Sequence, residues 1–257
     1  MTIHQDLVNG ELAIEIDIDN GARLSSIDFR GYECVLPFRG QMLNWGWYAM
    51  APWAGRIRDG IIKSSDGEEH QLPTNLAPPH AIHGFTLTNP WQLVGDGILA
   101  LEFPDPYRGA RLEQRIELVD NAIRWSLEYE SGDCDLPFWL GIHPWFPREL
   151  HRGGAVEINF HAGKMFERGS DYLPTGKLIK PTNGPWDDAF TEVRGTPTLS
   201  WEDAIQIQID CDSPYWVVYD QDSEGVCVEP QTAPPDAANL GISGDSYLEA
   251  LFIFEEI

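Results

Sequence analysis

Apolar and polar residues alternate with a period of two along much of this 257-residue chain. In Glu11–Ile18, for example, Leu12, Ile14 and Ile16 fall on one face and acidic residues fall on the other. Such alternation predicts a β-strand with one buried face. The same pattern predicts further strands at Arg111–Leu118, where Gln114 interrupts the apolar face, and at Ala122–Tyr129, Val156–Phe160, Ala204–Ile209, Tyr215–Tyr219 and Tyr247–Phe254. The last of these is apolar on both faces, which is typical of a strand buried on both sides.

Glycine and proline, 24 and 19 residues respectively, separate these strands and leave little room for helices. Only Pro235–Leu240 could form a helical turn. No linker, charge block or internal repeat divides the chain, so we expect a single domain over residues 1–257. Its predicted class is all-β, a large antiparallel β-sandwich with little helix. Two stretches poor in strand signals, Phe38–Ala81 and Glu167–Ser200, are expected to be functional loops over one sheet face.

The charge of the chain excludes some classes of partner. Its formal net charge of −24 disfavours binding to nucleic acid or to an anionic membrane, which both need a basic face. The first ten residues lack the pattern of a signal peptide, and no apolar stretch is long enough to span a membrane. Scattered cysteines without a C-x-x-C pair suit reduced thiols, so we expect a cytoplasmic protein. They are Cys34, Cys134, Cys211 and Cys227.

Two segments place an ionisable residue just before a proline. The first reads G-V-C-V-E-P-Q-T-A-P-P-D-A-A-N-L, and in it Glu229 follows a strand-like run that Pro230 is expected to end. The second reads L-P-F-W-L-G-I-H-P-W-F-P, and in it His143 is likewise expected at a strand end before Pro144, among aromatic residues that include Trp145. Either residue could be structural, as an acidic residue before a turn or a core histidine bonded to a carbonyl. Their parallel placement favours a functional site.

Other segments supply groups suited to a sugar. Arg56 lies among tryptophans, where it could stack on a ring or present donors to hydroxyl groups. His83 precedes a glycine, so a loop could carry its ring into a cleft. His80 and His83 are three residues apart, but nothing else supplies metal-ligand spacing. In P-W-D-D-A-F, Asp187 could form a turn or accept hydrogen bonds from hydroxyls beside a tryptophan.

These motifs together resemble the aldose 1-epimerase (galactose mutarotase-like) family. A-P-W-A-G-R-I, H-G-F, G-I-H-P-W-F, W-D-D-A-F and V-E-P-Q-T-A-P-P-D-A occur in the order and spacing of that family. The resemblance implies a β-sandwich with a sugar cleft across one sheet, and neither metal nor cofactor. It implies that Glu229 is the catalytic base and His143 the catalytic acid. It also implies that Arg56, His83 and Asp187 hold or orient the sugar, and we expect Trp145, as part of the aromatic wall beside His143, to contact it as well.

One departure concerns the position before the arginine, where the family often has asparagine and this chain has Gly55. Because glycine supplies no side-chain amide to the cleft, the sugar preference is left open. We also expect a nearby carboxylate to raise the pKa of His143 toward the working pH. The resulting prediction is a cofactor-independent mutarotase that interconverts the anomers of a free hexose or a related sugar, as a monomer or homodimer.

Three alternatives remain. A hexose-6-phosphate mutarotase would need additional cations near the cleft, with Arg58, Arg108 and Arg148 as candidates. A glycoside hydrolase would pair Glu229 with Asp187 as its two carboxylates. The third is a carbohydrate-binding protein without catalytic activity.

Overall fold

The chain folds into two large β-sheets, which the computed structural model describes for all residues except 7–9 and 96. Every strand pairing within these sheets is antiparallel for the described residues. The first sheet, in spatial order, consists of β1 (Thr2–Asp6), β2 (Leu12–Asp17), β3 (Arg23–Phe29), β5 (Trp47–Met50), β14 (Gly141–Pro147), β22 (Gly225–Gln231), β21 (Tyr215–Tyr219), β18 (Asp187–Val193), β16 (Ala162–Arg168) and β17 (Pro174–Ile179), with β4 (Tyr32–Glu33) beside β3.

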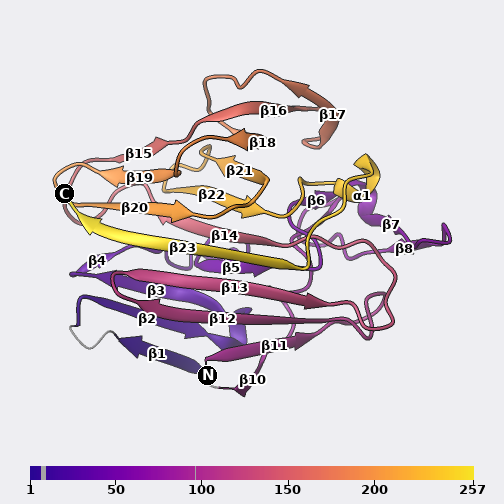
Figure 1. Cartoon of the computed structure of the whole chain (residues 1–257), viewed down its shortest axis with the longest axis horizontal. Helices are drawn as coiled ribbons and strands as arrows, with labels where there is room; N and C mark the ends of the chain where they lie inside the picture. Colours follow the sequence, from indigo (N-terminus) through magenta and orange to yellow (C-terminus); the bar gives the residue numbers. More distant parts are fainter. Residues whose placement is uncertain (7–9, 96) are drawn as a thin grey trace.

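The second sheet has a simpler order in which most neighbours are joined by short connections. It consists of β10 (Gln92–Gly95), β11 (Ile98–Glu102), β12 (Arg111–Val119), β13 (Ala122–Glu130), β23 (Tyr247–Glu256), β20 (Ile205–Asp210), β19 (Thr198–Trp201) and β15 (Val156–Asn159). Two small pairs, β6 (Arg56–Ile57) with β9 (Ala81–Ile82) and β7 (Ile61–Lys63) with β8 (Glu69–Gln71), lie at one end of the molecule (Figure 1).

Helix is confined to three short segments among the described residues. They are the 3₁₀ turns η1 (Ile18–Asn20) and η2 (Arg58–Gly60) and the single-turn helix α1 (Ala237–Leu240). None of these helices is long and apolar enough to cross a membrane. The fold class is therefore the all-β sandwich that the alternating pattern predicts.

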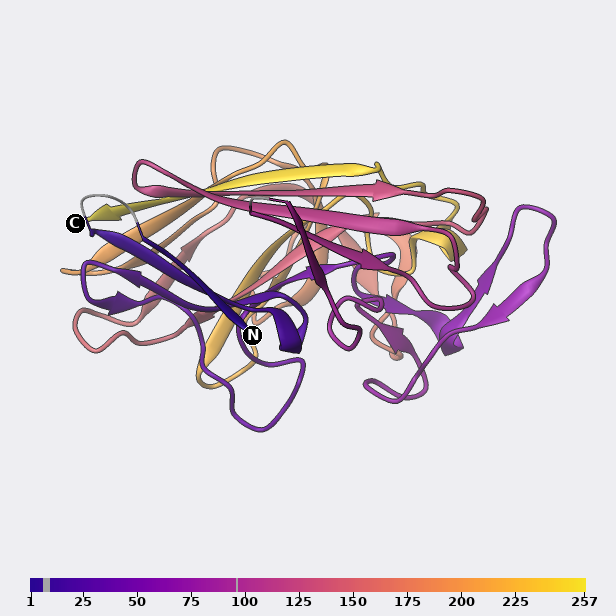
Figure 2. The same ribbon diagram turned by 90° about the horizontal axis from the view of Figure 1, so that it is seen from below.

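The two sheets stack face to face, with the hydrophobic core between them. Figure 2 separates the layers and shows the β7–β8 hairpin extending from one end. Trp47 of the first sheet packs at 4.7 Å between ring centroids against Phe252 of the second, and at the same distance against Phe146 of its own sheet. Large aromatic contacts of this kind bury much apolar area and hold the layers together.

The predicted strands are present within one or two residues of their expected bounds, but two details differ. Tyr247–Glu256 is not buried on both faces, because it alternates between buried and exposed residues. Its polar face is open to solvent although the strand lies inside the sheet. Gln114 does not interrupt the buried face. Its side chain is buried and donates a hydrogen bond to the carbonyl of Ala22.

The stretches expected to be loops contain strands. Residues 38–81 include β5 to β8, and residues 167–200 include β17, β18 and most of β19. Asp187 therefore lies at the start of β18 and not in a loop. Two-residue and three-residue strands are too short to give a periodic signal, and Asp187–Val193 begins with two acidic residues, which disfavour strands in isolation.

The two prolines were also expected to end their strands, and this expectation is wrong. β14 continues through Pro144 to Pro147, and β22 continues through Pro230 to Gln231. The two strands pair at Gly141 with Gln231 and again from Trp145 with Cys227 onward. Pairing is interrupted between these points. Because proline has no N–H group to donate, its natural place in a sheet is such an interruption.

Candidate active site

The register of the central strands brings His143 and Glu229 face to face. The pairs Gly141–Gln231 and Trp145–Cys227 share one register, which places His143 directly opposite Glu229 in the interrupted stretch. Directly opposed residues of an antiparallel pair point to the same side of the sheet. Two residues that are 86 positions apart in the sequence therefore become neighbours on the face that points away from the core.

The two side chains contact each other in a buried position. Nε2 of His143 lies 3.3 Å from Oε1 of Glu229. Their residues are only 5% and 2% exposed. The second carboxylate oxygen, Oε2, accepts a hydrogen bond of 3.0 Å from Nε2 of Gln231. Each oxygen of Glu229 thus has a defined partner, which fixes the orientation of the carboxylate.

Aromatic rings enclose the imidazole of His143 on three sides. Tyr48 stacks on it with ring centroids 4.6 Å apart, and Trp145 stacks at 5.5 Å. The ring of His83 meets it edge-on at 4.9 Å. Tyr48, His83 and Trp145 all line the pocket. Trp139 and Phe146 belong to the buried core.

A second polar cluster lies farther along the same pocket. Oδ2 of Asp187 is 3.6 Å from a guanidinium nitrogen of Arg56 and 3.6 Å from one of Arg168. Both guanidinium groups lie 5.8 Å from the ring centroid of Tyr172. Arg168 also contacts Asp188, with Nε 3.3 Å from Oδ1. The arginines and carboxylates offer both donors and acceptors to the hydroxyl groups of a ligand.

His83 and Arg56 reach the pocket from the small β6–β9 pair. The backbone N–H of Gly55 donates a hydrogen bond of 3.2 Å to Nδ1 of His83. In a neutral imidazole whose Nδ1 accepts, the proton is on Nε2, so Nε2 is left as a donor. Gly55 has φ +72°, and a Cβ there would lie 2.6 Å from the side chain of Pro235. The position before Arg56 is therefore occupied by glycine because a side chain has no room.

Part of the pocket lining is apolar. Phe166, Ala189 and Val217 form a small hydrophobic cluster separate from the main core. They line the same pocket as His143, Glu229 and the arginines, and its volume is about 160 Å³. A pocket that combines an apolar surface with polar groups suits a pyranose ring, which has C–H faces and an equatorial belt of hydroxyls.

Burial shifts both central groups toward their neutral forms. It lowers the pKa of His143 to about 3, and the positive charge of Arg23 acts in the same direction. It raises the pKa of Glu229, and the negative charge of Asp187 adds to this effect. Burial also lowers the pKa of His83. The expectation that the carboxylate raises the pKa of His143 is wrong, since desolvation of the imidazole outweighs the attraction.

Potential metal ligands also meet beside the pocket. Ligand atoms of His143, Cys227 and Glu229 lie within 4.8 Å of one another. The three types of donor could hold a divalent cation, and the prediction that no metal is needed stays a prediction. His80 does not take part in this group. Its Nδ1 accepts a hydrogen bond from the backbone N–H of Asp59.

The structure gathers all six residues expected from the sequence in one pocket. Glu229, His143, Arg56, His83, Asp187 and Trp145 all line it. The pocket also contains residues that the sequence analysis missed. Gln231 could have been found, because a period of two places it on the same face as Glu229. Arg168 gave no signal, because its stretch was taken as a loop.

The three arginines considered for a phosphate group lie elsewhere. Arg58 pairs with Asp171 and Asp236. Arg108 forms an exposed pair with Asp105, and Arg148 donates to the carbonyls of residues 220 and 222. None of the three lines the described pocket. Arg168, which the sequence analysis did not single out, does line it.

Comparison with known proteins gives the family. The profile of the aldose 1-epimerase family matches residues 9–248, which is most of the chain. This chain belongs to the aldose 1-epimerase family. The match includes every residue of the pocket, and the family indicates an isomerase that acts on a sugar.

The chain is also similar to individual proteins. The chain is 25% identical to the uncharacterized protein YihR of Escherichia coli K12 over 265 residues, with 86% of this chain and 82% of that protein covered. A GalM/aldose epimerase homologue from C. elegans is similar in structure, with a TM-score of 0.81, 16% identity and coverage of 100% and 99%. A galactose mutarotase-like protein from Clostridium acetobutylicum gives a TM-score of 0.78, 15% identity and the same coverage. At these identities the two structures establish the fold.

Proposed function

We propose that this protein is an aldose 1-epimerase that interconverts the α and β anomers of a free hexose or a related sugar. Glu229 acts as the base and His143 as the acid. The observation that carries this proposal is the 3.3 Å contact between Nε2 of His143 and Oε1 of Glu229 at one end of the pocket. Two groups this close can reach the anomeric hydroxyl and the ring oxygen, which are bonded to the same carbon.

The reaction needs one proton removed and one delivered in the same step. Glu229 takes the proton of the anomeric hydroxyl while His143 protonates the ring oxygen, and the ring opens. Rotation about the C1–C2 bond and closure with the roles reversed give the other anomer. Burial raises the pKa of Glu229 and lowers that of His143, and both shifts disfavour the ionised pair from which the reaction starts. In that pair His143 carries the proton that goes to the ring oxygen, and Glu229 accepts the proton of the anomeric hydroxyl.

The other pocket residues would hold the sugar. Arg56, Asp187 and His83 offer donors and acceptors to hydroxyl groups, and Trp145 forms a wall beside His143. Asp187 lies between two guanidinium groups, which suits an acceptor for hydroxyls better than the second catalytic carboxylate of a glycoside hydrolase.

The central test replaces each proposed catalytic group by a polar side chain that cannot act as a base or an acid at neutral pH. Glu229→Gln and His143→Asn should each slow anomer exchange by about 10²–10⁴-fold, the usual contribution of a general acid or base. Exchange is measured by polarimetry or saturation-transfer NMR on fresh α-glucose and α-galactose. Sugar binding, measured by ligand-detected NMR, should persist.

Matched controls carry the same chemical change outside the pocket. Glu249→Gln and His161→Asn alter exposed residues and should exchange anomers at the wild-type rate. Wild-type rates in both Glu229→Gln and His143→Asn would refute the assignment of base and acid. Binding without exchange in the wild type would instead establish a carbohydrate-binding protein.

One observation favours a second candidate, a mutarotase for hexose 6-phosphates. Arg168 adds a second guanidinium group to that of Arg56 in the pocket. Two arginines could hold a phosphate, although Asp187 and Asp188 already partner them. Comparing exchange rates on glucose and glucose 6-phosphate separates the candidates. A cytoplasmic location, a monomeric or homodimeric state and independence of cofactors stay predictions.

A further inference from the structure

Arg23 is an unusual residue for the interior of a β-sandwich. It begins β3, is 0% exposed and directs its guanidinium group toward the segment 42–45. Burial lowers its pKa to about 10, so it remains charged at neutral pH. A buried cation needs well-placed acceptors to offset the loss of hydration.

Its donors bind that segment at several points. Nη1 donates to the carbonyls of Trp45 at 2.8 Å and Met42 at 3.2 Å, and Nη2 lies 3.3 Å from the sulfur of Met42. Nε donates to the carbonyl of Asn20 at 2.7 Å. The guanidinium group also stacks on the ring of Trp45, 4.2 Å from its centroid. Arg23 thus ties the segment 42–45 to β3.

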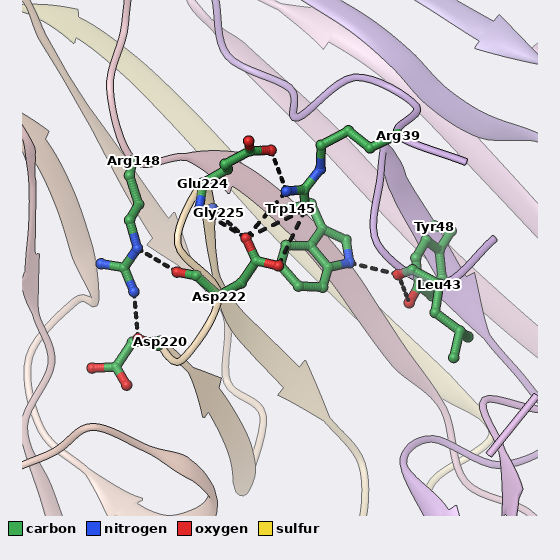
Figure 3. A network of polar contacts seen from close by, with 9 residues as sticks. All are labelled: Arg39, Leu43, Tyr48, Trp145, Arg148, Asp220, Asp222, Glu224 and Gly225. Atoms are coloured by element: carbon green, nitrogen blue, oxygen red, sulfur yellow. Dashed lines mark hydrogen bonds and ion pairs between the residues drawn. The ribbon is translucent and has the colours of Figure 1, made fainter. Parts of the chain in front are cut away.

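The same segment presents one carbonyl to two aromatic side chains. The carbonyl of Leu43 accepts a hydrogen bond of 2.9 Å from the hydroxyl of Tyr48 and one of 2.7 Å from Nε1 of Trp145 (Figure 3). These are the two rings that stack on either side of the imidazole of His143. A single backbone oxygen therefore fixes both walls of the slot that holds the imidazole.

We propose that Arg23 is a positioning residue for His143, acting through the Leu43 carbonyl and the rings of Tyr48 and Trp145. The chain of contacts is continuous from the guanidinium group to the imidazole, and Arg23 itself does not reach the pocket. In a site where the acid must point at one oxygen of the sugar, small rotations of the imidazole lower the rate strongly. This inference rests on the proposed function for its kinetic readout, and on the geometry alone for its spectroscopic one.

The first variant removes one link while keeping the ring. Tyr48→Phe deletes the hydroxyl that binds Leu43 and should lower kcat about tenfold with KM within about twofold, as expected when orientation and not binding is lost. The matched control is Tyr107→Phe. Tyr107 is equally buried and donates to the carbonyl of Pro137 at 2.7 Å, outside the pocket. The Tyr107→Phe protein should lose about as much stability as the Tyr48→Phe protein and keep the wild-type kcat.

The second variant tests Arg23 directly. Arg23→Lys keeps the charge but loses the fork that reaches several acceptors, so it should show the same loss of kcat as Tyr48→Phe. The spectroscopic readout is the imidazole signal of His143 in NMR, assigned with His143→Asn. Because the ring currents of Tyr48 and Trp145 act on it, this signal should shift in Tyr48→Phe and Arg23→Lys and stay in place in Tyr107→Phe.

Two results would overturn the proposal. One is a Tyr48→Phe protein whose kcat and imidazole signal match those of Tyr107→Phe. The other is a folded Arg23→Lys protein with both readouts at their wild-type values. If Arg23→Lys does not fold, the Tyr48→Phe comparison decides. If the wild type exchanges no anomers, the proposed function fails, and the imidazole signals still decide whether the residues position His143.

Discussion

His143 and Glu229 illustrate how burial can oppose the attraction between an acid and a base. In water a carboxylate beside an imidazole favours the charged forms of both. In this pocket the pKa of His143 falls to about 3 and that of Glu229 rises, because both groups lose most of their hydration. The two side chains are therefore in contact although burial disfavours their charged forms. A bound sugar would supply hydrogen bonds that stabilise those charged forms.

The neutral histidines predict how stability depends on pH. His143 and His83 have folded pKa values below the ordinary 6.5, so below that pH the unfolded chain binds protons that the folded chain excludes. Their contribution is fully present above pH 6.5 and is lost as the pH falls. The lowered pKa of His143 should cost about 2 kcal/mol of unfolding free energy between pH 7 and pH 5, and that of His83 acts in the same direction.

Urea unfolding at several pH values checks this prediction. His143→Asn should reduce the acid-induced loss by about 2 kcal/mol relative to wild type. His161→Asn, which removes an exposed histidine, is the control and should leave the loss unchanged. A loss of equal size in wild type and His143→Asn would contradict the prediction. The raised pKa of Glu229 acts in the opposite direction, so the comparison between variants is more informative than the absolute slope.

At the scale of the elements, two prolines lie where the pairing between the central strands is interrupted. Pro144 and Pro230 lie inside β14 and β22, where the ladder between these strands is interrupted. The strands keep one register across the interruption, so His143 and Glu229 remain opposed. The prolines therefore remove ladder donors beside the site without moving it.

The segment before Arg56 gives a prediction at the same scale. Gly55→Ala should lower the unfolding free energy by about 1–3 kcal/mol, because φ is +72° and the added Cβ would meet Pro235 at 2.6 Å. It should also disturb the hydrogen bond from Gly55 to His83 and weaken sugar binding. Gly40→Ala is the matched control, since Gly40 has φ +89° and nothing within 4 Å of the added Cβ.

Urea unfolding of both variants separates backbone strain from the clash. Gly40→Ala should show the cost of the positive φ alone, and Gly55→Ala a clearly larger loss. Equal losses would mean that the segment carrying Arg56 moves freely away from Pro235. Sugar affinity of Gly55→Ala then shows whether the position of His83 depends on this contact.

At the scale of the whole molecule, the acidic charge dominates long-range electrostatics. With a net charge of −24, repulsion among surface carboxylates should exceed the small stabilisation from exposed ion pairs such as Arg108–Asp105. Raising sodium chloride from about 20 mM to about 500 mM at pH 7 should therefore raise Tm by about 2–5 °C, because it shortens the screening length. Calorimetry measures this, and choline chloride controls for sodium binding. A lower Tm at high salt would show that the ion pairs dominate.

Much of this molecule could be predicted from its sequence, for reasons that differ between fold and site. The alternation of apolar and polar residues predicted the long strands, because one face of each strand is buried. The motifs gave Glu229 and His143, whose residue types suit acid–base chemistry. Sequence could not give the register that opposes them, because pairing between distant strands leaves no local pattern. Arg23 was missed because no local pattern places the segment 42–45 beside it, and Arg168 was missed because its stretch was taken as a loop.

The proposed catalytic residues lie on the central strands β14 and β22, whereas several other pocket residues lie on peripheral segments. Both proposed catalytic side chains stand on strands flanked by others in the larger sheet, where the backbone has little freedom. Arg56 and His83 come from the small pair at its end, and Tyr172 from the turn between β16 and β17. Turns of this kind tolerate exchange and insertion far better than central strands do. Changes in these peripheral segments could thus alter the sugar preference while His143 and Glu229 stay in place.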